Sequence, residues 1–238
     1  MPAGRLSVVV TRRLPEPVET RMKELFDVDL RDPDRPMGRE ELAEAMRRAD
    51  VLVPTITDVI DAGLLAQAGD RLKLIANYGA GVDHIDVATA RQRGILVSNT
   101  PGVVTEDTAD MTLALILGVT RRIPEGLAVM QSGDWPGWSP MALLGGRIGG
   151  KRLGILGMGR IGQGIARRGA HGFGMNVIYH NCSRLSPELE AQCKARYVSK
   201  EELLRTADHL VLVLPYTAES HHVIGAAEIA QMKKLLGQ

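Results

Sequence analysis

Aromatic side chains are scarce in this sequence, in which only 3% of the 238 residues are Phe, Trp or Tyr. Hydrophobic residues still make up 45% of the chain, so a core can be built from aliphatic side chains. Such a core suits stacked layers of helices and parallel strands. The length permits two modest domains or one large domain.

Cysteines and excess charge are also lacking. Cys182 and Cys193 show no C-x-x-C spacing, which argues against a disulfide framework or a metal site and favours reduced thiols. The 29 basic and 28 acidic residues nearly cancel, whereas nucleic acids and anionic membranes select clustered positive charge. No apolar run reaches the roughly 18 residues of a membrane span, and residues 1–5 lack a signal-peptide core. We therefore expect a cytoplasmic protein without nucleic-acid or membrane partners.

The first hundred residues alternate between strand and helix patterns. The predicted strands cover 6–10, 28–30, 51–53, 72–76 and 95–97, and the predicted helices cover 15–26, 39–48 and 85–92. This alternation, with short connections, predicts a parallel sheet with right-handed crossovers. A breaker cluster at 99–102 then predicts a hinge.

A longer helix is expected after this hinge, with Thr105 as its N-cap and an end near Arg122. A second helical piece follows Pro124, and then a loop that contains both Trp135 and Trp138.

A glycine-rich turn follows a short apolar strand at 153–156. In the pattern G-x-G-x-x-G, Gly157 permits a tight turn, Gly159 lets the backbone approach a pyrophosphate, and Gly162 lets the next helix pack on the sheet. The N-terminus of that helix offers free N–H groups to phosphates. A second strand at 176–180 ends about 20 residues later, where a βαβ unit predicts it. We interpret 157–162 as a dinucleotide site; the alternative is a glycine-rich loop that binds nothing.

Several motifs in order give the chain a family resemblance. They occupy 77–83, 98–101, 105–110, 135–138, 157–162 and 214–217. With them the sequence, from residue 6 to about Lys233, resembles the D-isomer-specific 2-hydroxyacid dehydrogenases, most of all the glyoxylate and hydroxypyruvate reductases.

The resemblance implies a fold and an activity. It implies an α/β protein with a flavodoxin-like, parallel-sheet substrate domain at 1–101 and a Rossmann-type NAD(P)-binding domain at 102–238, with the active site between them. Such enzymes reduce a small 2-keto acid to the 2-hydroxy acid with hydride from the nicotinamide. The resemblance further implies a homodimer joined through the cofactor domain, with the helix at 105–122 and the tryptophan loop near the contact.

Binding residues follow from the resemblance, position by position. The turn formed by Gly79, Ala80, Gly81 and Val82 matches the loop whose amides hold the substrate carboxylate, although an ordinary turn is the alternative. Asp83 is expected to brace that loop. The cofactor residues are Gly157, Met158, Gly159, Arg160, Ile161 and Gly162, together with Thr105, Leu214 and Pro215.

The choice between NADP and NAD is argued from the end of the strand at 176–180. NAD-specific sites place an acid there for the ribose 2′-hydroxyl, but Asn181 is neutral. Arg184, beside Ser183, could pair with a 2′-phosphate. These residues favour NADP; if Arg184 is only a solvated surface charge, either cofactor binds.

No catalytic residue is predicted. The family supplies an arginine, a histidine and a glutamate, but no arginine follows Arg205 and no histidine follows His222. His84, His221 and His222 are not expected to act as the acid. We therefore expect a truncated family member whose cofactor domain is incomplete, with an unpaired edge at a strand over 210–214. The alternative is an NAD(P)-binding or dimerising protein without turnover; a formate dehydrogenase relative is less favoured.

Overall fold

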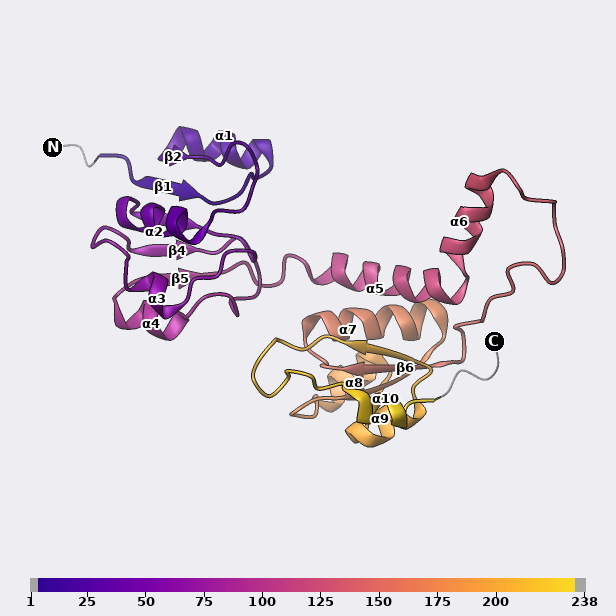
Figure 1. Cartoon of the computed structure of the whole chain (residues 1–238). Coiled ribbons are helices and arrows are strands. Elements are labelled where there is room, and N and C mark those ends of the chain that lie inside the picture. Colours follow the sequence, from indigo (N-terminus) through magenta and orange to yellow (C-terminus); the bar gives the residue numbers. More distant parts are fainter. Residues whose placement is uncertain (1–3, 234–238) are drawn as a thin grey trace. The chain divides into compact units, whose positions relative to one another are not determined.

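The computed structural model describes residues 4–233, which divide into two compact units, Met1–Val103 (unit 1) and Val104–Gln238 (unit 2) (Figure 1). The expectations about the first three residues and about the segment after Lys233 lie outside the described residues. Within the described part, no helix is long and apolar enough to cross a membrane. Each unit is an α/β structure around its own parallel sheet, which confirms the predicted fold class.

The sheet of unit 1 has five strands in the order β2-β1-β3-β4-β5. These are β1 (Ser7–Val10), β2 (Asp27–Asp29), β3 (Val51–Val53), β4 (Leu74–Ala76) and β5 (Leu96–Ser98). All neighbours are parallel, and the order 2-1-3-4-5 is that of flavodoxin-like sheets. The connecting helices are α1 (Glu16–Leu25), α2 (Arg39–Arg48), α3 (Ala62–Leu65) and α4 (Val87–Gln92).

Alternating side chains of the strands build two cores in unit 1. Val9 of β1 joins one cluster with Leu52, Ile75 and the buried face of α2. Val8 and Val10 face the other way and pack with apolar residues of α1 and the segment after it. Because side chains of a strand point to opposite faces in turn, both faces of β1 are covered.

Unit 2 contains a four-stranded parallel sheet in the order β8-β7-β6-β9. Its strands are β6 (Arg152–Leu156), β7 (Asn176–His180), β8 (Ala195–Tyr197) and β9 (His209–Leu212). Its helices are α5 (Thr105–Thr120), α6 (Ile123–Ser132), α7 (Arg160–Arg167), α8 (Pro187–Cys193), α9 (Lys200–Thr206) and α10 (Ala226–Gln231). When the four strands are numbered by their sequence order within this unit, their spatial order is 3-2-1-4. This is the order of one Rossmann half with the next strand added.

The two faces of this sheet carry separate cores. Leu153 and Ile155 of β6 pack with α5 and α7, while Leu156 packs with Leu203 of α9. Helix α5 lies alongside α7 (Figure 1), and a Cβ on Gly164 would meet the Cβ of Ala109 at 3.2 Å. These contacts hold α7, and with it the glycine-rich turn, at the carboxyl end of β6.

The structure corrects some local predictions. Thr105 is the first residue of α5 and makes no side-chain capping bond, because Val104 occupies the N-cap position. Helix α8 and strand β8 were not predicted, since three-residue β8 is too short to show a period. Strand β9 ends at Leu212, and among the described strands it forms the predicted sheet edge beside β6.

Candidate functional site

The glycine-rich turn at the end of β6 requires glycine at two positions for different reasons. Gly157 has a φ of 102°, and a Cβ there would lie 2.5 Å from the carbonyl oxygen of Val213. A Cβ on Gly162 would lie 2.3 Å from the carbonyl oxygen of Gly157. Both distances are far below contact range, so the turn and α7 approach each other only without side chains.

Gly159 differs, because a Cβ there would meet nothing within 4 Å. It is the N-cap residue of α7, and the first bond across the cap runs from the Gln163 N–H to the Gly159 carbonyl. The N–H groups of Arg160, Ile161 and Gly162 therefore have no acceptor within the helix. Free space in front of free N–H groups fits a pyrophosphate. The Met158 side chain is buried in the core, which leaves only its backbone for a ligand.

Other predicted cofactor residues lie around this turn. The Gly157 N–H donates to the His180 carbonyl at 3.0 Å, which ties the turn to the end of β7. A Cβ on Gly157 would meet Leu214 Cδ2 at 2.9 Å, so Leu214 lies beside the turn, and the exposed Pro215 follows it. Thr105 is near α7, with its Cγ2 at 3.9 Å from a Cβ built on Gly164.

The segment after β7 is held by side-chain bonds. Asn181 Nδ2 donates to the Ser183 carbonyl at 3.1 Å, and the Tyr197 hydroxyl donates to the Asn181 carbonyl at 3.2 Å. Arg184 forms an ion pair with Glu190. Sequence reasoning missed Glu190, because its distance of six residues from Arg184 matches no helical pairing rule.

In the glycine turn of unit 1, residues 79–82, every carbonyl group accepts a hydrogen bond. The carbonyl of Gly79 accepts from the Thr100 N–H at 3.0 Å, that of Ala80 from Asn99 Nδ2 at 2.8 Å, and that of Val82 from the Ile85 N–H at 3.0 Å. The N–H groups of these four residues donate no hydrogen bond within the described chain. A turn with paired carbonyls and free N–H groups can receive an anion.

Asn77 organises this turn, a role that sequence reasoning did not assign. It is 2% exposed, and its Nδ2 donates to the carbonyls of Gly79 at 3.1 Å and Gly81 at 2.7 Å. The amide oxygen Oδ1 can only accept, so in its 3.0 Å bond with His84 the ring nitrogen Nε2 carries the hydrogen. Burial lowers the pKa of His84, which favours the neutral ring.

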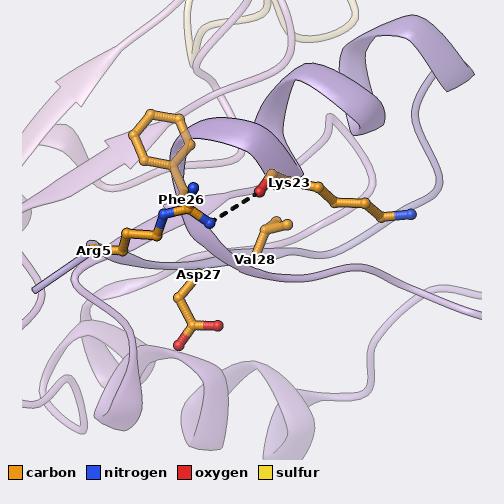
Figure 2. Close-up of a pocket in the computed structure, with 5 residues that line it drawn as sticks. All are labelled: Arg5, Lys23, Phe26, Asp27 and Val28. Atoms are coloured by element: carbon orange, nitrogen blue, oxygen red, sulfur yellow. Dashed lines mark hydrogen bonds between the residues drawn. The ribbon is translucent and has the colours of Figure 1, made fainter.

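Two hollows in unit 1 lie away from these residues. One, of about 560 Å³, is lined by Arg5, Lys23, Phe26, Asp27 and Val28 (Figure 2). Here Arg5 donates to the carbonyls of Lys23 and Glu24 at the end of α1, which is a helix-capping arrangement. The second, of about 450 Å³, lies between the segment at 29–32 and α2. Within the described residues no cluster of side chains is suited to a metal ion.

Comparison with known proteins identifies relatives that match nearly the whole chain. The family model described as D-isomer specific 2-hydroxyacid dehydrogenase, NAD binding domain, matches residues 113–236. The chain is 45% identical over 231 residues to the glyoxylate reductase of Thermococcus litoralis, a match that covers 95% of this chain and 69% of that protein. It is 46% identical over 235 residues to the glyoxylate reductase of Aeropyrum pernix, covering 97% and 69%.

A solved structure extends the likeness to three dimensions. A glyoxylate reductase from Paecilomyes thermophila superposes with a TM-score of 0.81 at 34% identity, and the match covers 98% of this chain and 71% of that one.

Proposed function

Because the chain belongs to the D-isomer-specific 2-hydroxyacid dehydrogenase family, a family of NAD-dependent oxidoreductases, we propose that its substrate is glyoxylate or hydroxypyruvate and that NADPH is its preferred cofactor. The observation that carries the proposed substrate is 45% identity to a glyoxylate reductase over 231 residues. In the proposal, unit 1 holds the substrate carboxylate and unit 2 holds the dinucleotide.

The dinucleotide half of the proposal rests on the turn at 157–162. Free N–H groups at the start of α7 would hold the pyrophosphate. Leu214, which lies beside Gly157, the following Pro215, and Thr105, which lies beside α7, would meet the rest of the cofactor. Asn181, Ser183 and Arg184 would meet the adenosine ribose, where the absence of an acid at Asn181 favours a 2′-phosphate. When bound, the nicotinamide supplies the hydride.

The substrate half rests on the turn at 79–82. Its N–H groups would bind the carboxylate of the keto acid and orient the neighbouring carbonyl without a cationic side chain. Hydride addition to the carbonyl carbon moves the C=O π electrons onto oxygen, which then takes a proton to become the hydroxyl group. We assign no side chain of this chain as that proton donor.

Steady-state kinetics of the purified chain test the proposed function. A fall in NADPH absorbance when glyoxylate is added, absent in a Gly159→Val variant that cannot seat the pyrophosphate, would support the proposed turnover. NADPH binding without consumption would contradict the proposed turnover. It would support the alternative, that the chain binds the cofactor or dimerises without catalysis.

A homodimer through unit 2 is part of the proposal. Helix α5 exposes Met111, Leu115 and Val119, spaced four apart on one face, and α6 has no buried residue. The segment after α6 exposes Trp135 and Trp138, the latter by 84%. An exposed apolar surface of this kind is typical of a protein interface. The family resemblance indicates a second copy of this chain as the partner.

Charge on this face is expected to separate the proposed dimer. In the double variant Leu115→Glu and Val119→Glu, two carboxylates would lie in a surface that must lose water, at a cost of several kcal/mol. Light scattering after size exclusion should then report the mass of one chain, against two for the parent. Leu96→Glu, at an equally exposed leucine of unit 1, is the control and should leave the mass unchanged. A parent chain that is already monomeric would contradict this part of the proposal.

A further inference from the structure

The guanidinium of Arg184 is engaged by a carboxylate from the neighbouring helix. Its Nε and Nη2 donate to Oε1 and Oε2 of Glu190 at 2.9 and 2.8 Å, a two-pronged arrangement. The Glu190 side chain is 12% exposed and that of Arg184 is 65% exposed. The carboxylate is therefore fixed in the surface of α8, and the guanidinium extends from it toward solvent.

A tyrosine fixes Glu190 in this position. The Tyr179 hydroxyl donates to Glu190 Oε1 at 2.7 Å and accepts from the Leu185 N–H at 2.9 Å. Bonds from Arg184 and Tyr179 lower the pKa of Glu190 to about 2, so the carboxylate is ionised near neutral pH. Tyr179 thus holds the backbone of the segment that follows β7, and Glu190 neutralises the arginine of that segment.

This arrangement changes what a ribose would meet at the end of β7. The 2′-phosphate of NADPH needs an arginine fork, but the fork of Arg184 already faces Glu190. The 2′-hydroxyl of NADH needs a free carboxylate, but both oxygens of Glu190 already accept bonds, and the Asn181 amide is bonded to the Ser183 carbonyl. Neither cofactor receives the full contribution of a dedicated partner.

We propose that Glu190 is a specificity-determining residue, which restrains the preference for NADPH by competing with the 2′-phosphate for Arg184. This inference rests on the proposed function, because it requires the nucleotide to bind with its ribose at the end of β7. Loss of the Glu190 carboxylate frees Arg184 and raises the affinity for NADPH alone, because NADH has no 2′-phosphate that the free guanidinium can bind.

Calorimetric titration of NADPH and NADH into the full chain and into Glu190→Gln tests this role. The glutamine still accepts the Tyr179 bond but no longer carries a charge. We expect NADPH to bind roughly fivefold more tightly to Glu190→Gln, because the 65% exposed guanidinium no longer has to leave an ion pair to meet the 2′-phosphate, while NADH affinity stays the same. The gain should shrink as salt is raised, because exposed charges are screened, and it should vanish in Glu190→Gln combined with Arg184→Gln.

A matched variant separates this effect from a general loss of negative charge. Glu202→Gln removes the partner of Arg196 elsewhere on unit 2 and should alter neither affinity. An unchanged NADPH to NADH ratio in Glu190→Gln, or weaker NADPH binding, would overturn the inference while the proposed function stands. A parent chain that binds neither nucleotide would refute the proposed function, and this inference with it.

Discussion

Replacement of Gly159 by valine is expected to abolish nucleotide binding and leave the fold intact. Nothing lies within 4 Å of a Cβ at this position, and its φ of −75° is one that valine can adopt. The added side chain would instead occupy the space in front of the free N–H groups of α7. We expect NADPH affinity to fall at least about 100-fold, while the loss of the glycine N-cap costs about 1 kcal/mol or less.

The matched variant Gly157→Val is expected instead to destabilise the fold. Its φ of 102° strains any side chain, and its Cβ would overlap the Val213 carbonyl oxygen at 2.5 Å. We expect the free energy of unfolding to fall by roughly 2–5 kcal/mol. Thermal unfolding and calorimetric NADPH titration of both variants distinguish the two glycines. Normal NADPH binding by a folded Gly159→Val chain would rule out the pyrophosphate site.

Asn77→Asp is expected to disable the carboxylate-binding turn. An ionised aspartate at this buried position would place one oxygen, in the position of Nδ2, against the carbonyls of Gly79 and Gly81, which now accept hydrogen bonds from Nδ2. Repulsion replaces both bonds, so the carbonyls rotate away and the N–H groups no longer converge. We expect glyoxylate affinity to fall at least about tenfold, and the lost bonds to cost roughly 2–4 kcal/mol of stability.

NMR titration of the ¹⁵N-labelled chain with glyoxylate measures glyoxylate binding and does not require turnover. Amide signals of Gly79, Ala80 and Gly81 should shift in the parent and stay in place in Asn77→Asp. Asn176→Asp is the control, because Asn176 Nδ2 also donates to a carbonyl, that of Gly150, but in unit 2. Shifts of equal size in the parent and in Asn77→Asp would show that Asn77 does not organise the site.

Most of the fold was predictable because its signals are local. Gly157, Gly159 and Gly162 sit between an apolar strand and a helix, and this local pattern identified the turn, although the Val213 carbonyl that approaches Gly157 comes from much later in the chain. The short strands of unit 1 were found from their apolar runs and breakers, and the family resemblance was correctly predicted from ordered motifs. Thr105 shows the limit of such reasoning, because a good capping residue lies one position inside the helix.

The sequence by itself determined the fold class, the family and the position of the glycine-rich turn, since these depend on patterns along the chain. Only the tertiary structure decided which hydrogen-bonding and charged groups are already paired within the chain. Glu190 engages Arg184, and the amide of Asn77 donates to the Gly79 and Gly81 carbonyls. The physical reason is that a hydrogen bond depends on distance and direction in space. A side chain six residues away, or one buried beneath a turn, leaves no periodic trace in the sequence.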